Sequence, residues 1–293
     1  MFVAIRDFTV RWLGYADLFS GLKDLGVSSF ELFVSRDLKE STYQDMGHTT
    51  ALSFDFSTEA SIQTFGDKLS AAGVKVCAIL IENDFGRADL QAEIDWVVNA
   101  CKVGAALDVE AVRINSIMKP RQTLSEAQYA QTTASAIKAI LDQTAGLTTC
   151  LALENHGVVG NKRELIRDLL ATVGSDRLGL TLDTGNFYWF GYPLDEVYAI
   201  IEEFAGYVKH THLKNVSYAV PDRQKRREPG AGWPDTAATI YAGDIDHKQV
   251  CTILRTAGYD GDLTIEDESL GGFPKQRWLE VIRKDIEYVN SLL

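Results

Sequence analysis

The sequence contains little cysteine and lacks long uninterrupted hydrophobic segments. The four cysteines, Cys77, Cys101, Cys150 and Cys251, are widely separated and show no Cys-x-x-Cys spacing. This distribution argues against a zinc or dithiol motif and indicates free thiols. The longest apolar runs, such as Val76–Ile81, have the length of a strand, and the first residues lack a basic, apolar leader. We therefore expect a soluble, cytoplasmic protein with no membrane partner.

Nucleotide-binding signatures and an excess of positive charge are also absent. The sequence has no GxGxxG after its first predicted strand and no GxxxxGK[ST] motif, which argues against dinucleotide or nucleoside triphosphate chemistry. The formal net charge is -12, and nucleic-acid binding depends on cationic contacts. The one dense basic run, Arg223–Arg227, is interpreted as a solvated loop more simply than as a phosphate site. We expect no nucleic-acid partner.

Short apolar runs alternate with helix-like stretches along the whole chain, and no linker rich in proline, glycine or serine interrupts them. This order is typical of parallel strands joined by crossover helices. Eight such units predict a single domain over residues 1–293 with the (β/α)8 TIM-barrel fold. The predicted strands are Val3–Asp7, Ser29–Val34, Val74–Ile81, Ala111–Asn115, Thr149–Glu154, Leu178–Asp183, Tyr207–Leu213 and Asp262–Glu266.

Capping signals indicate where two of the helices begin. Thr123 with Glu126, and Asn161 with Glu164, each have the spacing of a capping box, and Gly146 is expected to end the first of these helices. The other predicted helices lie near Tyr15–Leu25, Glu59–Ala72, Ala88–Val103, Leu194–Phe204, His247–Thr256 and Lys275–Leu292.

The connection after the seventh strand, Asn215–Ile245, is much longer than the others. A loop of this length on a compact barrel is typical of an active-site lid or a subunit contact, and the sequence leaves both interpretations open. We also expect a homo-oligomer, either a dimer or a tetramer.

Polar residues end four of the predicted strands. In a TIM barrel the functional groups lie at the carboxyl ends of the strands, so Glu154, Asp183, His212 and Glu266 are expected to meet at one mouth of the barrel. Three carboxylates in a buried site would repel one another, and a cation would relieve this repulsion. The set of ligands suits one divalent ion, with Mn²⁺ as the first choice and Mg²⁺, Co²⁺ or Zn²⁺ as alternatives.

The seventh strand contains two histidines, and its alternation favours one of them as the ligand. Residues two apart share a face of a strand, so His210, His212 and Lys214 point the same way, with His212 nearer the carboxyl end. His210 then lies deeper, as a group that supports the ligand or packs in the core. Lys214 is expected to bind a substrate oxygen or to pair with one of the carboxylates.

Four motifs resemble one family of barrels, the sugar phosphate isomerase/epimerase branch of the xylose-isomerase-like superfamily. They follow the order and spacing of that family over nearly the whole chain. The motifs are Leu153-Glu154-Asn155-His156-Gly157, Leu182-Asp183-Thr184-Gly185-Asn186-Phe187, His210-Thr211-His212-Leu213-Lys214, and Gly258-Tyr259-Asp260-Gly261 with Ile265-Glu266. The resemblance implies a single divalent metal, a sugar or sugar derivative as substrate, and Glu154, Asp183, His212 and Glu266 as the ligands.

The resemblance also implies a reaction. It predicts an isomerase or epimerase that moves a proton next to a sugar carbonyl through an enediolate that the metal stabilises. In ketose 3-epimerases of the superfamily, the glutamates that match Glu154 and Glu266 are the acid/base pair. Metal coordination is expected to keep both glutamates anionic, while burial is expected to raise their proton affinity towards a working range.

Departures from the epimerase pattern keep other reactions open. Ketose 3-epimerases have a glutamate, a histidine and an arginine where this chain has Gly160, Asn186 and Tyr218. His156, two residues after Glu154, is instead a candidate catalytic acid or base, against the alternative of a structural histidine. Such an imidazole would also suit a keto-sugar dehydratase or lyase, similar to inosose dehydratase or to C-glycoside deglycosidase. The other alternative is a non-catalytic partner subunit.

Further candidates for substrate binding follow from position alone. Arg113 and Glu31 lie on strands where they point towards the barrel or its mouth, and each is expected either to bind substrate or to form an internal ion pair. Asn186 is expected to hold a hydroxyl group. Trp189 belongs to the aromatic run Phe187–Phe190, which would stack on a sugar ring or contact another subunit.

Overall fold

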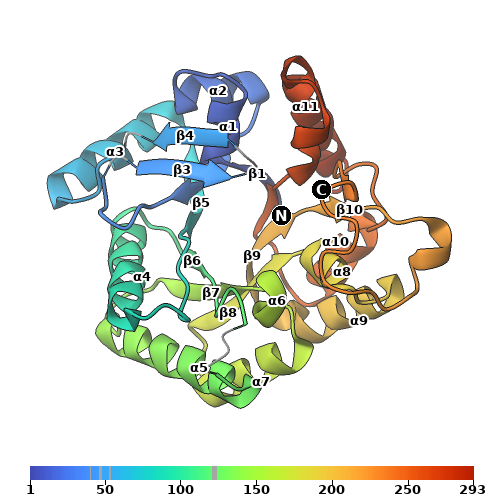
Figure 1. The fold of residues 1–293 in the computed structure, drawn as a ribbon. Coiled ribbons are helices and arrows are strands. Elements are labelled where there is room, and N and C mark those ends of the chain that lie inside the picture. The colour runs from blue at the N-terminus through green and yellow to red at the C-terminus, as the bar shows by residue number, and fades with distance from the viewer. Residues whose placement is uncertain (40, 46–47, 53, 121–123) are drawn as a thin grey trace.

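Eight parallel strands close into a barrel that helices surround, as the alternation of apolar runs predicted (Figure 1). The computed structural model describes residues 1–39, 41–45, 48–52, 54–120 and 124–293. The barrel strands, in the order in which they pair, are β1 (Phe2–Arg6), β12 (Asp262–Ile265), β9 (Val208–Leu213), β8 (Leu178–Asp183), β7 (Cys150–Glu154), β6 (Ala111–Ile114), β5 (Lys75–Leu80) and β2 (Ser29–Phe33).

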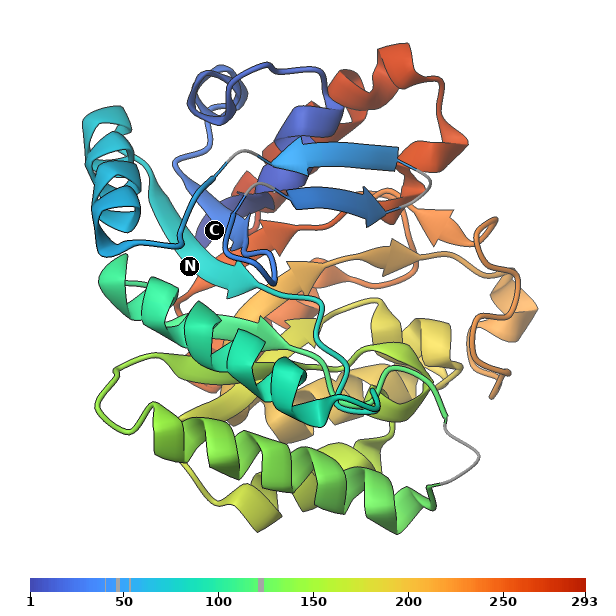
Figure 2. The same cartoon turned by 60° about the vertical axis from the view of Figure 1, so that its left-hand side comes forward.

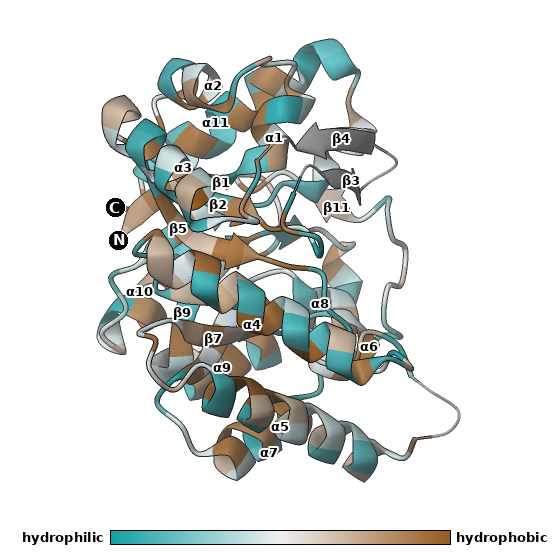
Figure 3. Ribbon diagram, turned by 90° about the vertical axis from the view of Figure 1, so that its left-hand side faces the viewer, coloured by the Kyte–Doolittle hydropathy of each residue, from teal (hydrophilic) through white to brown (hydrophobic). Residues whose placement is uncertain are grey.

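Helices lie around the outside of the barrel (Figure 2). Their buried apolar residues pack against the strands, and hydrophilic and hydrophobic residues alternate along them (Figure 3). Within the described residues, no helix is long and apolar enough to cross a membrane. The larger helices are α2 (Leu18–Leu25), α3 (Glu59–Ala72), α4 (Leu90–Ala106), α5 (Glu126–Gln143), α7 (Arg163–Val173), α9 (Leu194–Phe204), α10 (His247–Thr256) and α11 (Trp278–Asn290).

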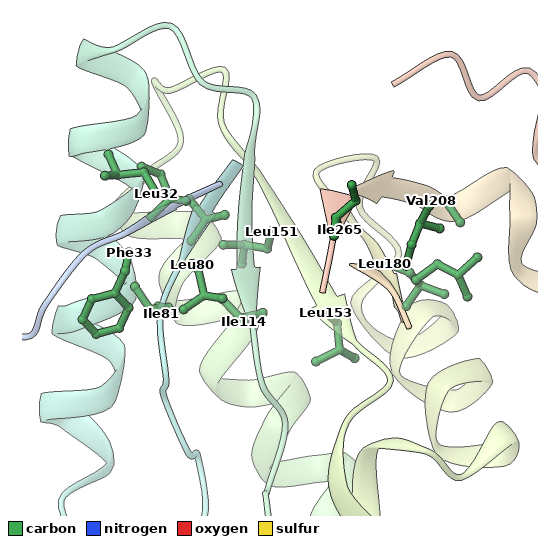
Figure 4. Packing of buried hydrophobic residues seen from close by; sticks show 14 of the residues in the cluster. Leu32, Phe33, Leu80, Ile81, Ile114, Leu151, Leu153, Leu180, Val208 and Ile265 are labelled. Atoms are coloured by element: carbon green, nitrogen blue, oxygen red, sulfur yellow. The ribbon is translucent and has the colours of Figure 1, made fainter. Parts of the chain in front are cut away.

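Alternation along each strand separates an apolar layer from the barrel interior. Leu151 and Leu153 on β7 join the large apolar cluster between strands and helices (Figure 4). Ala152 forms a separate small cluster with Ala78 and Ala111 of the neighbouring strands. Because residues two apart share a face, these small side chains leave room for the long side chains that follow two residues later on β6 and β7.

Several short elements were not predicted. The hairpin of β3 (Ser41–Asp45) and β4 (His48–Leu52) lies between β2 and α3. Short helices α1 (Asp7–Trp12), α6 (Gly157–Gly160) and α8 (Asn186–Phe190) follow β1, β7 and β8 directly. In side view, the termini lie side by side at one end of the barrel, and α6 and α8 lie at the other end (Figure 3).

Both capping predictions need correction. The proposed cap Thr123 lies outside the described residues, and α5 is capped by Ser125, whose Oγ accepts a hydrogen bond from the Gln128 amide. The helix ends at Gln143 rather than near Gly146, since the Thr144 hydroxyl bonds back to the Ile140 carbonyl. Helix α7 has no side-chain cap.

Asn161 is not the cap of α7 because its amide is used elsewhere. Its Nδ2 donates to the Gly157 carbonyl at 2.8 Å, and its Oδ1 accepts from Asn155 Nδ2 at 3.3 Å. Asn155 in turn accepts a hydrogen bond from the Asp183 amide at 2.8 Å. The two asparagines therefore fix the turn after β7 against the end of β8, which is a task that the capping spacing did not reveal.

The long connection after β9 is anchored to α8 by Arg227. The Arg227 amide donates to the Gly191 carbonyl at 2.9 Å, and its guanidinium donates to the Tyr188 carbonyl and lies 3.9 Å from the centre of the Tyr218 ring. Gly191 has φ 107°, and a Cβ there would collide with the Arg227 carbonyl oxygen. Only glycine therefore allows this close approach.

The basic run in the same connection is occupied by local contacts. Arg223 pairs with Asp244 at 2.9 Å, and the Arg226 guanidinium lies 4.0 Å from the centre of the Tyr192 ring. These contacts fit the interpretation of the run as part of a surface loop.

A pair of buried acids links the end of this connection to α11. Asp285 Oδ1 accepts a hydrogen bond from the Ile240 amide at 3.1 Å, and its carboxyl group is hydrogen-bonded to Asp267. Burial, followed by the charge of Asp267, raises the pKa of Asp285 to about 10. Asp285 is therefore protonated at neutral pH and donates its proton to Asp267.

We predict that Asp285→Asn stabilises the protein at neutral and alkaline pH. The unfolded Asp285 is ionised above about pH 4, so folding takes up a proton, and the stability present below that pH is lost as the pH rises towards 10. Asparagine supplies the same acceptor and donor without this proton. We expect a melting temperature about 2–4 °C higher at pH 8, which is roughly 1 kcal/mol, and a smaller gain at pH 5. Asp285→Ala should lower it at both values, and an equal gain for Asp285→Asn at both would contradict the protonation.

Candidate metal centre and adjoining cavity

The structure brings the four predicted ligand residues together at the carboxyl end of the barrel. Glu154 and Asp183 end β7 and β8, His212 lies on β9, and Glu266 follows β12. One ligand atom from each lies within 4.8 Å of those of the other three, and all four side chains are buried. The spacing and the donor types are those of a site for one divalent ion.

His212 presents one nitrogen to the other ligands and the opposite nitrogen to the barrel interior. Its Nδ1 lies 3.2 Å from Glu154 Oε1 and 3.0 Å from Glu266 Oε2. Its Nε2 lies 2.8 Å from Glu31 Oε1. His210 lies deeper, as its position on β9 predicted, and contacts Glu31 rather than the ligand carboxylates.

Each of the three clustered carboxylates has a basic partner, and two of these partners, Arg113 and Lys214, form the ion pairs that were among the expected alternatives. Arg113 pairs with Glu154, and Arg6 pairs with Glu266. Lys214 Nζ lies 2.8 Å from Asp183 Oδ2, and all three basic side chains are buried. The cluster of acids is therefore balanced by cations of the chain itself.

This pairing corrects the expected basicity of the two glutamates. Burial alone would raise the pKa of Glu154, but Arg113 and His156 outweigh it and hold this pKa well below its usual range. Burial is likewise outweighed at Glu266, whose pKa is held well below its usual range by Arg6 and Lys214. The glutamates are stable anions, which suits ligands better than proton acceptors.

Asp183 differs from the two glutamates. Burial, opposed by Lys214 and reinforced by the charge of Glu266, raises the pKa of Asp183 to about 6. Its Oδ1 accepts hydrogen bonds from the amides of Gly185 and Asn186 at 2.8 Å each, which orients the carboxylate. A bound cation would relieve the repulsion that raises this pKa.

The cluster fits a divalent ion by the state of its oxygens. Among the described residues, Glu154 Oε2, Asp183 Oδ2 and Glu266 Oε2 are buried and accept no hydrogen bond, although each has an ion-pair partner. Each of these oxygens has a second lone pair that a metal could take beside its ion-pair partner, and in Asp183 the other oxygen is already occupied by the amides of Gly185 and Asn186. Oxygen-rich ligation with one imidazole nitrogen is typical of Mn²⁺, and zinc also accepts these ligands.

His156 lies beside Glu154 and is about 30% exposed. Its Nδ1 lies 2.9 Å from Asn115 Oδ1 and 3.0 Å from Arg113 Nη2. The amide oxygen requires a proton on Nδ1, whereas the guanidinium requires a lone pair there, so the two neighbours support opposite tautomers. Burial lowers the pKa of His156, which favours the neutral ring at neutral pH.

A cavity of about 300 Å³ adjoins the cluster. Lys214, which contacts Asp183, lies in its wall, and Lys214 Nζ is also 3.2 Å from Glu268 Oε1. The full lining is His156, Gly157, Asn186, Trp189, Lys214, Trp233 and Glu268. This volume is at the lower end of the range for small-molecule sites, and the lining combines polar side chains with two indole rings.

Backbone hydrogen bonds place the two indoles together. The Gly230 amide donates to the Trp189 carbonyl at 2.9 Å, and the Trp233 amide donates to the Gly230 carbonyl at 3.0 Å. Gly230 has φ 73° and packs against the Trp189 ring. The connection after β9 therefore contributes one wall of the cavity and α8 contributes another.

A family model for the xylose isomerase-like TIM barrel matches residues 19–292, which is most of the chain. The chain belongs to this family. The predicted fold and the predicted resemblance are thereby confirmed. Among curated proteins, the chain is 26% identical over 146 residues to the uncharacterised protein MJ1311 of Methanocaldococcus jannaschii. That alignment covers 48% of this chain and 44% of the relative, so the chain matches less than half the length of the relative.

Solved structures share the xylose isomerase-like fold at low sequence identity. The IOLI protein with a bound zinc atom has a TM-score of 0.73 and 14% identity, covering 100% of this chain and 99% of that one. D-psicose 3-epimerase from Clostridium cellulolyticum H10 has a TM-score of 0.68 and 13% identity, and the match covers 100% of this chain and 99% of that one. Mannonate dehydratase from Streptococcus suis serotype 2 has a TM-score of 0.65 and 17% identity, and the match covers 100% of this chain and 93% of that one. At these identities the likeness shows the fold alone.

The expected substrate groups of this family member divide into two sets. Asn186, Lys214 and Trp189 line the cavity as expected. Arg113 does not line it, because its guanidinium is held behind Glu154 and donates to the Ile81 carbonyl at 2.8 Å. For Arg113 the alternative of an internal ion pair describes the geometry.

Glu31 also takes part in internal pairing, within the barrel. Two of the three positions where ketose 3-epimerases have a glutamate, a histidine or an arginine serve the fold here, while the third, Asn186, lines the cavity. Gly160 packs closely against Ser116, and Tyr218 packs edge-on against Tyr188.

Four contributors to the site were not predicted. Arg6 ends β1 as a polar residue after an apolar run, so the rule that found the ligands would also have selected it. Trp233 lines the cavity from an irregular segment and Glu268 from the start of a short 3-10 helix, Glu268–Gly272, and neither segment is long enough for a periodicity to indicate direction. Asn115, the partner of His156, follows the end of β6.

Proposed function

We propose that this protein is a divalent-metal-dependent sugar isomerase that moves a proton from the carbon next to a carbonyl to the carbonyl carbon itself. The observation that carries the proposal is the cluster of Glu154, Asp183, His212 and Glu266, beside a cavity whose wall contains His156. A sugar or sugar derivative is the substrate class that the family and the cavity support. We also propose that residues 1–293 form a single domain and that the protein assembles as a homo-oligomer, either a dimer or a tetramer.

Glu154, Asp183, His212 and Glu266 would hold the metal, and its chemistry would be to polarise the sugar carbonyl and stabilise the developing negative charge. Mn²⁺ is the first choice because three of the four donors are carboxylate oxygens, and Mg²⁺, Co²⁺ and Zn²⁺ are alternatives. The zinc in the structurally similar IOLI protein supports a divalent ion.

His156 is the group that moves the proton in this proposal. Glu154 and Glu266 are poor proton acceptors because Arg113 and Arg6 stabilise their anions. The neutral imidazole of His156 lines the cavity and can take a proton on either nitrogen with support from its neighbours. A single base can return a proton only to the face from which it came, which favours isomerisation over epimerisation.

Lys214 and Asn186 orient the substrate. Both line the cavity, and Lys214 Nζ lies 3.4 Å from Asn186 Oδ1. The ammonium group donates to a substrate oxygen on the side of Asp183, and the Asn186 amide, whose Nδ2 is buried without a hydrogen bond in the described part of the chain, donates to a hydroxyl group. Glu268 accepts a hydroxyl hydrogen at the same end of the cavity.

We predict that Trp233→Ala raises KM and leaves metal affinity unchanged. The indole lines the cavity, where it stacks on the apolar face of the sugar, and it belongs to none of the ligand groups. A loss of about 1.4 kcal/mol would raise KM about 10-fold. Steady-state kinetics and metal titration measure the two effects. Tyr207→Ala is the control, because Tyr207 is 47% exposed at the start of β9, away from the cavity. An unchanged KM would exclude the stacking contact.

A dehydratase or lyase is the second candidate, and the position of His156 favours it. Elimination of water or an aglycone beside a carbonyl needs one base and the same polarising ion, so the same groups could serve it. The fold is shared with a mannonate dehydratase as well as with an epimerase. A non-catalytic partner subunit is the remaining alternative.

Incubation of the metal-loaded protein with ketoses and cyclic keto sugars deuterated at the carbon next to the carbonyl separates these candidates. Isomer formation with part of the deuterium transferred to the neighbouring carbon supports the proposed single-base isomerase. Complete washout with inversion at one carbon supports an epimerase with two bases, and loss of water or an aglycone supports the lyase. If the protein retains no divalent ion and changes none of these sugars, the partner-subunit alternative stands.

A further inference from the structure

The barrel interior below the proposed metal centre contains a continuous chain of buried polar contacts. His212 Nε2 lies 2.8 Å from Glu31 Oε1, and His210 Nε2 lies 3.0 Å from the same oxygen. His210 Nδ1 lies 2.9 Å from Asp262 Oδ2 at the other end. All four side chains are buried, and none of them lines the cavity.

We propose that Glu31 is a positioning residue that selects Nδ1 of His212 as the metal-binding nitrogen. This inference rests on the proposed function only in requiring that the cluster binds a divalent ion. It concerns a residue outside the ligand set, and it assigns to Glu31 neither substrate binding nor proton transfer.

The chemistry of the contact fixes the tautomer. A carboxylate oxygen can only accept, so His212 Nε2 must carry the hydrogen in its contact with Glu31. In the metal-free protein Nδ1 also faces carboxylates, those of Glu154 and Glu266, and carries a hydrogen as well. A metal bound among these carboxylates would displace the Nδ1 hydrogen, because Nε2 keeps its own hydrogen on Glu31. A carboxylate behind a ligating imidazole also makes the ligand more basic and fixes the plane of its ring.

Glu31 is itself held from both sides. Its Oε2 lies 3.5 Å from Arg6 Nε, and Arg6 also pairs with Glu266, so one guanidinium links the positioning carboxylate to a ligand. Its Oε1 accepts from both histidines, and Asp262 fixes His210 through an oxygen that also accepts a hydrogen bond from Thr264 Oγ1 at 2.7 Å. Rotation of Glu31 would break its contacts with both β1 and β9.

The fold explains why Glu31 can reach His212. β2 and β9 are not neighbours, because β1 and β12 lie between them in the pairing order. The side chain therefore crosses the barrel interior, where the small residues Ala78, Ala111 and Ala152 occupy little space. No pairing rule along the sequence connects residues 31 and 212, so the contact depends on closure of the barrel.

The decisive variant is Glu31→Gln. Glutamine keeps the shape but removes the charge, and its amide cannot accept from both histidines without placing a donor against Arg6 Nε. We expect a Kd for Mn²⁺ about 10–100-fold higher by isothermal titration calorimetry, the range for loss of a group that supports a metal ligand. The matched control is Glu93→Gln, because Glu93 is equally buried but pairs with Arg36 on the outside of the barrel.

A second measurement uses the unmodified protein loaded with Zn²⁺. Nitrogen-15 NMR of the histidine side chains should find His212 bound to zinc through Nδ1 and protonated at Nε2. Binding through Nε2 would overturn the proposal, whether or not Glu31→Gln folds. An unchanged Kd in folded Glu31→Gln would overturn it equally. If the unmodified protein binds neither Mn²⁺ nor Zn²⁺, the proposed function fails first, which is a separate result.

Discussion

Asp183→Asn is expected to abolish metal binding while leaving the barrel folded. The substituted amide would keep the oxygen that accepts the Gly185 and Asn186 amides, and it would replace the oxygen beside Lys214 by a nitrogen that cannot bind a cation. We expect the Kd for Mn²⁺ to rise by more than about 100-fold, above the roughly 10–100-fold expected for a group that only supports a ligand. Turnover should fall with it.

Thermal melting distinguishes this loss from misfolding. Asp183→Asn removes the carboxylate that pairs with buried Lys214, so the metal-free variant is expected to melt at a lower temperature than the metal-free parent but still in one cooperative transition. Added Mn²⁺ should raise the melting temperature of the parent and of the Glu93→Gln control but not that of Asp183→Asn. Equal stabilisation of all three would exclude Asp183 from the ligand set.

His156→Gln is expected to remove most of the activity and to leave the metal in place. His156 lines the cavity and is not among the four clustered ligands, so only proton transfer should suffer. General acid–base catalysis typically contributes about 100–10,000-fold, and we expect kcat to fall within that range with an unchanged Kd for Mn²⁺. Full activity in this variant would remove His156 from the mechanism.

The role of His156 as a base also predicts how kcat changes with pH. Burial lowers the pKa of His156, so the ring acts as a base from below its ordinary pKa upwards. kcat should therefore rise with pH through that lowered value and stay level above it, and His156→Gln should lose this rise. Asn115→Asp is a useful comparison, because a carboxylate beside Nδ1 would favour the charged ring and move the rise to higher pH.

The clustering of the four proposed ligand residues could be predicted because each is recognised from its position within its own strand. Glu154, Asp183 and Glu266 each follow an apolar run, and a closed parallel barrel brings the ends of such runs to one mouth. His212 was preferred to His210 by alternation on one strand, and the structure places His210 deeper. The resemblance to the sugar phosphate isomerase/epimerase branch pointed to the same four residues.

The partners of these residues could not be predicted, because they depend on closure and on irregular segments. Arg6 meets Glu266 across the junction of the first and last strands, and Glu31 meets His212 through the barrel interior. The predicted direction of the pKa shifts of Glu154 and Glu266 was therefore wrong. Burial was foreseen, but the two arginines that outweigh its effect on these pKa values were not. Trp233 reaches the cavity through a turn at Gly230.

The balance between acids and basic side chains has a consequence for how the protein is made. Because Arg113, Arg6 and Lys214 each pair with a ligand carboxylate, the nascent chain does not need the ion to overcome repulsion while the barrel closes. Folding can precede loading, and a chelator should strip the ion from the proposed site without unfolding the chain. The cell could then hold a pool of folded, metal-free protein whose metallation follows whichever divalent ion is available.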